Sequence, residues 1–188
     1  MPNVSAYCQV FPACDDGGVT DEAIAACQRA MGFLELGMPE DAISELDSLP
    51  AESAYFSPAL HLKVDALFRL QDWTAAAEIC LPMLEREPSD PGWWIQAAYA
   101  QRRASSIVEA EIILRSGLQG HPRHVLMLYN LACYACVQER FAEACTLLSQ
   151  AFAEEPDPAL AMAEKDPDLE QIRPWILEQV KRHRSAPR

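Results

Sequence analysis

The sequence is poor in positive charge and contains no long apolar run. Its 15 Lys and Arg residues stand against 28 Asp and Glu, which gives a formal net charge of −13. Such a surface repels phosphate backbones and anionic lipid, so we expect no nucleic acid and no membrane as partner. No apolar stretch approaches the length that a bilayer requires, and the first residues lack the basic and apolar regions of a secretion signal. We therefore expect a cytoplasmic protein.

Motifs that carry chemistry are also missing. The chain has no Gly-rich phosphate loop, no Gly-x-Ser-x-Gly and no His-Glu-x-x-His. Cys133 and Cys136 form a Cys-x-x-Cys, but their place in mid-helix does not lower a thiol pKa, and no second ligand pair follows at zinc spacing. His121 and His124 flank a predicted turn without a thiol or carboxylate positioned beside them. We expect no enzyme, no metal and no cofactor.

Cysteine is present in an odd number, seven, without the spacing of a small disulfide scaffold. In a reducing compartment these residues are interpreted as free thiols, most of which act as small core hydrophobes.

What the sequence does contain is a 34-residue period. Alanine recurs at this spacing, at Ala42, Ala76, Ala110 and Ala144. A small side chain is needed where two helices cross closely, and alanine meets that need. Bulky residues three positions earlier are expected to fill the wedge toward the next unit; they are Trp73, Ile107 and Phe141. Apolar residues follow four positions later, at Leu46, Cys80, Leu114 and Leu148.

From Ala23 to Pro158 this pattern resembles the tetratricopeptide-repeat (TPR) family, as found in bacteria. The match is clearest in the last unit, where the family positions are Leu131, Ala132, Ala135, Phe141, Ala144, Leu148, Ala151 and Pro156. Gly117 stands where an alanine is usual, and the first unit has Ala54 in place of the closing proline, with Leu49-Pro50 ending its second helix early. The resemblance implies an all-α fold of four tandem TPR helical hairpins in a right-handed superhelix, with a C-terminal capping helical segment.

Three regions are expected along the chain. Residues 1–19 form an extended N-terminal arm before a helix capped at Thr20. Residues 20–158 hold the four TPR units, at about 23–56, 57–90, 91–124 and 125–158. Residues 159–188 form capping helices and a basic tail, in which Asp166-Pro167 is a helix start. The cap is expected to turn five apolar side chains inward: Leu169, Ile172, Trp175, Ile176 and Val180.

In proteins of this family, the first helices of the units line an inner wall that binds peptides. Helical spacing along these helices gives the candidate binding residues. They are Cys27, Met31, Leu34, His61, Asp65, Phe68, Arg69, Ile95, Tyr99, Arg102, Arg103, Tyr129, Cys133 and Cys136. Arginines beside aromatic residues suit a peptide with apolar and acidic character, although the arginines could instead pair internally with Asp65 or neighbouring glutamates.

The predicted function is a protein-binding adaptor or chaperone-like module that holds a peptide segment in its concave groove. The family's carboxylate clamp is not kept, since only Asn130 matches it, so the heat-shock chaperones that the clamp recognises are not expected as partners. Asn130 is itself a further candidate binding residue. The alternative is a structural scaffold that forms a homo-oligomer through its convex face or its C-terminal cap.

The N-terminal arm itself resembles the expected ligand. It carries apolar Tyr7, Val10 and Phe11, followed by Asp15 and Asp16. At about 3.3 Å per residue the arm can extend roughly 60 Å, so the hypothesis that it lies in its own groove or that of a neighbouring molecule is not limited by reach.

Overall fold

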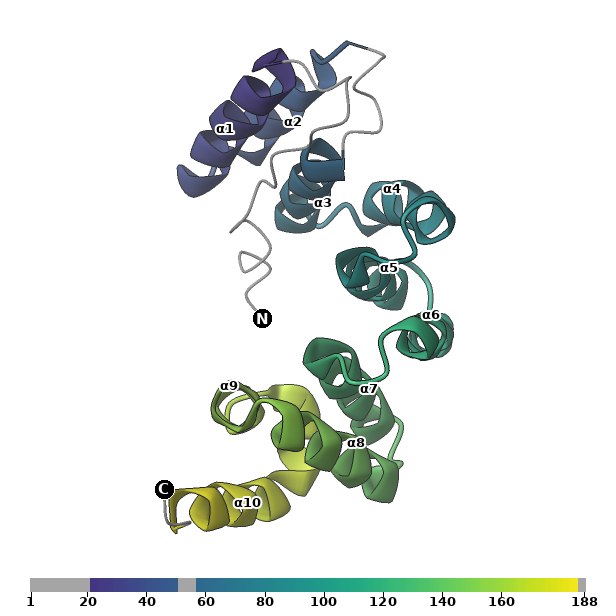
Figure 1. Ribbon diagram of the computed structural model, residues 1–188, viewed down its shortest axis with the longest axis vertical. Coiled ribbons are helices and arrows are strands. Elements are labelled where there is room, and N and C mark those ends of the chain that lie inside the picture. Colours follow the sequence, from purple (N-terminus) through teal and green to yellow (C-terminus); the bar gives the residue numbers. More distant parts are fainter. Residues whose placement is uncertain (1–20, 51–56, 186–188) are drawn as a thin grey trace. The chain divides into compact units, whose positions relative to one another are not determined.

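The computed structural model describes residues 21–50 and 57–185, and these residues are almost entirely helical (Figure 1). Four hairpins pair successive helices. Their first helices are α1 (Asp21–Glu35), α3 (Ser57–Leu70), α5 (Pro91–Ala104) and α7 (Val125–Val137). Their second helices are α2 (Pro39–Asp47), α4 (Trp73–Arg86), α6 (Ile107–Gly120) and α8 (Phe141–Glu154). The all-α fold of four TPR-type hairpins is thereby confirmed.

The helices α1 to α4 form one compact unit, which ends at Arg86 and is called the N-terminal unit here. In this unit α1 packs on α2, both pack on α3, and α3 packs on α4. Buried side chains such as Cys27, Leu34 and Leu46 form its core around Ala42. The helix α2 is short and ends at Asp47, as the Leu49-Pro50 pair predicts.

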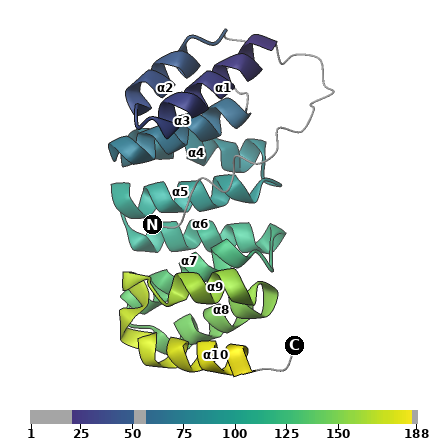
Figure 2. The same cartoon turned by 90° about the vertical axis from the view of Figure 1, so that its left-hand side faces the viewer.

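The helices from α5 onward form a second compact unit, the C-terminal unit, which begins at Glu87. Helices α5 to α8 pack in sequence, and three further elements follow: α9 (Pro156–Ala163), the 3-10 helix η3 (Pro167–Ile172) and α10 (Arg173–Ser185). Figure 2 shows α8, α9 and α10 running side by side at the end of this unit. The predicted capping segment is therefore present and helical.

The 34-residue register holds at the helix crossings. All four repeated alanines are completely buried. Of the apolar residues four positions after them, Cys80, Leu114 and Leu148 are also completely buried, and Leu46 is 6% exposed. The wedge positions behave differently, because Trp73 and Ile107 are half-buried while Phe141 is 39% exposed. Of the three residues expected to fill the wedge, Phe141 is thus the most exposed, and it lies in the first turn of α8.

The turns inside the hairpins also follow the repeat. Gly37, Gln71 and Glu139 occupy the same register position, and all three have left-handed backbone angles, with φ of 74°, 60° and 62°. In each turn the next residue's N–H bonds back to a carbonyl five residues earlier, as with Met38 to Phe33. Ser105, the fourth member of the series, has φ of −137° instead. Only one of these positions is a glycine.

The C-terminal cap buries the side chains that its sequence pattern selects. Leu169, Ile172, Ile176 and Val180 are buried in the core of the C-terminal unit, and Trp175 stacks on Phe152 of α8 with ring centroids 6.1 Å apart. Asp166 accepts a hydrogen bond from the Asp168 N–H, which confirms the predicted helix start.

Some of the sequence-based expectations lie outside the described residues, namely the arm at 1–19, the cap at Thr20 and Ala54. Among the described helices, none has the length and apolar character needed to cross a membrane.

Candidate peptide-binding face

The candidate residues fall in two places, α1 and α3 of the N-terminal unit and α5 and α7 of the C-terminal unit. In the N-terminal unit, Cys27 and Leu34 are buried in the core, and Phe68 is buried beside Trp73. Met31 and His61 are half-buried. Arg69 pairs with Asp65 at 3.1 Å and donates a hydrogen bond to the Leu34 carbonyl at 2.5 Å. The alternative of internal pairing is thus the one observed for Arg69.

On α5, the candidates divide between core and surface. Ile95 packs partly against the core of the C-terminal unit, while Arg103 is exposed. The Arg103 guanidinium lies 3.8 Å from the centroid of the Tyr99 ring, one helical turn earlier. This is a cation–π arrangement between two side chains on one face of α5. Such a pair is a suitable anchor for a peptide that combines acidic and apolar side chains.

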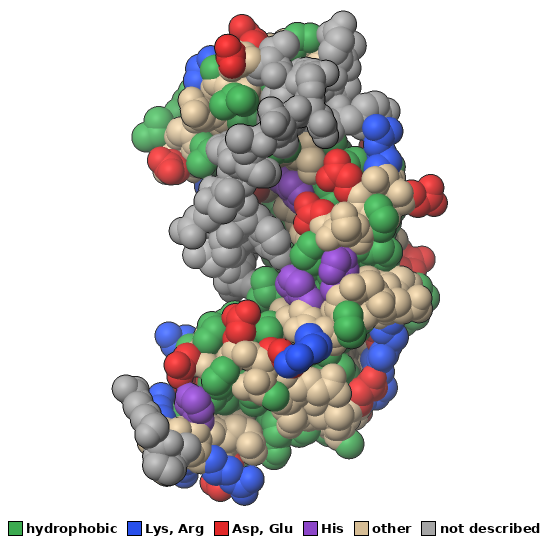
Figure 3. Space-filling model, viewed as in Figure 1, with side chains coloured by type: hydrophobic (Ala, Val, Ile, Leu, Met, Phe, Trp, Pro, Cys, Tyr) green, Lys and Arg blue, Asp and Glu red, His purple; other side chains and the backbone are tan. Residues whose placement is uncertain are grey.

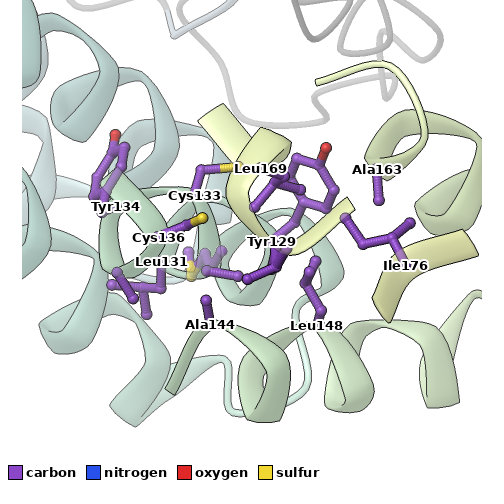
Figure 4. Packing of buried hydrophobic residues seen from close by; sticks show 14 of the residues in the cluster. Tyr129, Leu131, Cys133, Tyr134, Cys136, Ala144, Leu148, Ala163, Leu169 and Ile176 are labelled. Carbon is purple, nitrogen blue, oxygen red and sulfur yellow. The ribbon is translucent and has the colours of Figure 1, made fainter. Parts of the chain in front are cut away.

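On α7, the candidates lie beneath the chain's own C-terminal segment. Tyr129, Cys133 and Cys136 are at most 3% exposed, whereas Asn130 is half-buried. In Figure 4 the η3 ribbon crosses in front of α7, and the Leu169 side chain lies beside Tyr129. These three side chains therefore do not line an open surface here, because η3 covers them.

Polar contacts hold η3 on α7 through one carboxylate. The Tyr129 hydroxyl donates to Asp166 Oδ2 at 2.9 Å, and the Cys133 thiol donates to the same oxygen at 3.6 Å. The other oxygen of Asp166 accepts the Asp168 N–H at 3.0 Å. Asp166 thus begins η3 and fixes it to α7 at the same time, and both of its oxygens are used.

A second carboxylate connects η3 to α5. Arg102 Nη1 lies 2.6 Å from Asp168 Oδ2, and its guanidinium is 5.0 Å from the centroid of the Tyr134 ring. The Arg102 and Asp168 side chains are only 22% and 29% exposed, so solvent screens the pair less than at the surface. A charge-assisted hydrogen bond of this kind contributes more than a neutral one.

The pKa values of this cluster follow from burial and charge. Burial, together with Asp166 and Asp168, raises the pKa of the Cys133 thiol well above its ordinary value. Burial and the neighbouring Cys133 and Asp166 likewise raise the pKa of the Tyr129 hydroxyl. For Arg102, burial opposes the charge, but the hydrogen bond and attraction of Asp168 outweigh it and raise the pKa. The Tyr129 hydroxyl and the Cys133 thiol therefore keep their protons and remain hydrogen-bond donors at neutral pH, and Arg102 remains a cation.

One group of possible metal ligands occurs in the part of the chain that the structure describes. The ligand atoms of Cys133, Asp166 and Asp168 lie within 4.8 Å of one another. However, the thiol must lose its proton to bind a metal, and its raised pKa opposes this. The Arg102 guanidinium already neutralises Asp168 from the other side. The cluster is better described as an ion-paired contact than as a metal site.

Away from this contact, the surface charges of the C-terminal unit are interspersed, and acidic and basic side chains lie next to one another (Figure 3). Arg115 pairs with Glu111 at 2.6 Å, and Arg123 pairs with Glu154 at 2.7 Å. Exposed ion pairs of this type contribute little individually.

Helical spacing predicts Arg102, Tyr129 and Cys133 as site residues. It does not predict Asp166 and Asp168, which contact them. The pattern Asp166-Pro167-Asp168-Leu169 predicts a helix start, and nothing in its spacing indicates that both carboxylates meet α5 and α7. Only the reversal of the chain after α9 brings them there.

Comparison with solved structures supports the fold. No protein-family model matches the chain, and no curated protein matches its sequence. MamA 41-end from Desulfovibrio magneticus RS-1 is 16% identical, with a TM-score of 0.62 over 90% of this chain and 99% of that one. The MamA RS-1 ArsTM double mutant gives the same identity and TM-score over 89% and 99%. A structure named as a putative protein binding protein from Bacteroides ovatus ATCC 8483 is more distant, with a TM-score of 0.40 and 14% identity over 85% of this chain and 98% of that one. The chain therefore has a helical-repeat fold of the TPR type.

Proposed function

We propose that this chain is an adaptor or chaperone-like module, which binds a peptide segment of another protein on the face of its C-terminal unit that α5 presents. The observation that carries the proposal is the Tyr99–Arg103 pair on α5, where an exposed guanidinium lies over an aromatic ring beside the partly buried Ile95. Aromatic residues and arginine dominate the binding energy of protein interfaces. The TPR-type fold supports the proposal, because it is a stack of hairpins without an evident catalytic constellation among the described residues.

The expected ligand has apolar anchors and acidic side chains. Arginine recognises carboxylates through a planar fork of donors, and Tyr99 and Ile95 offer apolar surface next to it. We expect the partner to be a protein or peptide, without a cofactor.

The test is selection of peptides by the full chain from a phage-displayed random library. Enriched sequences should combine acidic and apolar residues, and Tyr99→Ala and Arg103→Glu should weaken their binding at least about tenfold, as expected for interface anchors. The matched control is Arg123→Glu, because it makes the same charge change in the exposed turn before α7. If no peptide is enriched, or if the three variants bind alike, the proposal fails.

A second candidate is the self-associating scaffold, favoured by two exposed apolar side chains on α6. Val108 is 56% exposed and Ile112 is 60% exposed, one helical turn apart. Light scattering over a concentration series separates the two functions. Association that Val108→Glu with Ile112→Lys abolishes would support the scaffold, and a monomer at all concentrations would contradict it.

A further inference from the structure

The returning segment, defined as residues 166–172, lies on the inner side of the last hairpin. The end of the helix stack is covered separately, because α9 packs on α8 at the place where the first helix of another unit would follow. After α9 the chain reverses, and η3 packs against α7. The returning segment therefore does more than close the stack, since it occupies a face that family resemblance assigns to ligands.

The contacts of this segment have two chemical components. Its apolar component is Leu169, which is completely buried, and Ile172, which is 6% exposed. Its acidic component is Asp166 and Asp168, which receive hydrogen bonds from Tyr129 and Arg102. The Asp166 carboxylate thus contacts the Tyr129 hydroxyl and the Cys133 thiol, and the Asp168 carboxylate contacts the Arg102 guanidinium. Leu169, the next residue, packs in the apolar core of the C-terminal unit.

Hydrogen bonds from one arginine stabilise the reversal of the chain between α9 and η3. Arg173 donates to the Glu164 carbonyl and, at 2.8 Å, to the Asp166 carbonyl. Further along, α10 is attached to α9 by His183 and Asp157, 2.8 Å apart, and these side chains are 39% and 89% exposed. That exposed pair contributes little. The segment itself is held by the polar contacts of Asp166 and Asp168 and by the burial of Leu169 and Ile172.

From this geometry we propose that the returning segment is an intramolecular ligand of the face formed by α5 and α7. A partner segment of the same chemistry displaces it, and the partner's pattern is an acidic residue, any residue, a second acidic residue and then a leucine. This inference rests on the proposed function and gives that site its ligand class and its regulation.

A partner protein fits this role better than a second copy of the chain. The returning segment follows α9 directly, so its effective concentration at its own face is high. A second copy presents the same contacts without that linkage and cannot compete well. A partner can add contacts to Tyr99 and Arg103 on α5, which the returning segment leaves exposed or half-exposed.

The test uses the full chain and a fluorescein-labelled peptide with the sequence of residues 164–172. Asp168→Asn removes the charge that pairs with Arg102 but leaves the receiving face intact, so the population with the segment detached rises. Because apparent affinity scales with that population, we expect the variant to bind the peptide at least about tenfold more tightly than the unmodified chain. Adding Arg102→Gln to Asp168→Asn should cancel the gain. Glu178→Gln, which removes an exposed carboxylate of α10, is the matched control and should not change the affinity.

Cys133 supplies an independent readout. Its thiol is buried beneath the returning segment, so its alkylation by iodoacetamide, followed by mass spectrometry, should be faster in Asp168→Asn and slower again with saturating peptide. Circular dichroism confirms that the variants remain folded. Equal peptide affinity and equal Cys133 alkylation in the Asp168→Asn and unmodified chains would overturn the proposal, as would dimers of the variant formed by exchange of the segment between copies.

These outcomes are separable from those of the proposed function. If library-selected peptides bind through Tyr99 and Arg103 with the same affinity to the unmodified chain and to Asp168→Asn, the displacement inference fails and the binding function stands. If neither the selected peptides nor the 164–172 peptide bind any form, both fail.

Discussion

A Cβ atom on Gly117 would lie 2.9 Å from Cγ of Trp94. Gly117 is in α6, at the register position where the TPR pattern has alanine, and the Trp94 indole of α5 lies directly against it. The indole is further fixed by a hydrogen bond of 3.0 Å from its Nε1–H to the Pro88 carbonyl. The departure from the repeat pattern therefore has a local cause, since a large ring occupies the volume of the missing methyl group.

Gly117→Ala is consequently expected to destabilise the C-terminal unit, although alanine is the better helix former. Overpacking of this kind typically costs about 1–3 kcal/mol, because the ring is held and its Cβ and Cγ atoms cannot swing away. Thermal or urea unfolding measures the loss. Gly120→Ala, in the same helix with nothing within 4 Å of its added Cβ, is the control and should not destabilise. Equal stability of Gly117→Ala and Gly120→Ala would contradict the explanation.

At Glu139, in the turn between α7 and α8, a substitution by glycine is expected to raise stability. Glu139 is exposed and has φ of 62°, a conformation that is strained for a residue with a Cβ atom. Glu139→Gly removes that strain and should raise the unfolding free energy by about 0.5–1 kcal/mol despite the greater freedom of glycine in the unfolded chain. Denaturant titration checks the gain. Ser105→Gly at the equivalent turn, where φ is −137°, should bring no gain.

Much of the fold could be predicted from the sequence, because equivalent positions of a tandem repeat have the same packing requirement in each unit and the pattern therefore recurs. The observed α7 and α8 begin and end within the last unit that the repeat predicts, at 125–158. The four alanines are completely buried, as the repeat predicts for residues at close helix crossings. Periodicity shows which face of a helix is covered, and in a hairpin stack the covering element is the next helix along the chain.

The candidate site was less predictable because its contacts are made by distant parts of the chain. The spacing of Tyr129 and Cys133 places them on the inner face, but whether solvent or another segment covers that face depends on the path after α9. Asp166 and Asp168 reach Tyr129 and Arg102 across 37 and 66 residues. A helix-start pattern such as Asp-Pro-Asp specifies local geometry and carries no information about that docking.

The 34-residue register predicts that a larger side chain at a helix crossing lowers stability. Ala144 is completely buried, so Ala144→Trp inserts an indole into a closely packed crossing in the C-terminal unit. We expect a loss of about 1–3 kcal/mol or more, with Ala110→Trp behaving similarly. Differential scanning calorimetry measures both. Ala142→Trp is the matched control, because Ala142 is exposed on the same helix as Ala144, and it should melt close to the unmodified chain. Melting of Ala144→Trp at the temperature of this control would reject the register.

Stability is expected to depend on pH through His124, the N-cap residue of α7. His124 is half-buried, and its Nδ1 is buried without a hydrogen-bond partner among the described residues. Burial, and then the neighbouring His121, lower the pKa of His124 below 6.5, although Glu155 and Asp90 oppose the shift. The unfolded chain therefore binds more protons than the folded one in this range, so stability is complete above about pH 6.5 and falls as the pH decreases toward the lowered pKa.

Melting temperatures at about pH 7.5 and pH 5.5 should show this fall, since 6.5 is the ordinary pKa of histidine and lies between them. The pKa values of Glu109 and Glu111 are lowered from 4.5, so these carboxylates do not contribute in this window. His124→Gln keeps a polar side chain without the proton equilibrium and should make the fall smaller. His183→Gln, which changes an exposed histidine near the end of α10, should leave the fall at least as large as in the unmodified chain. An unchanged fall in His124→Gln would show that the desolvated imidazole is not its source.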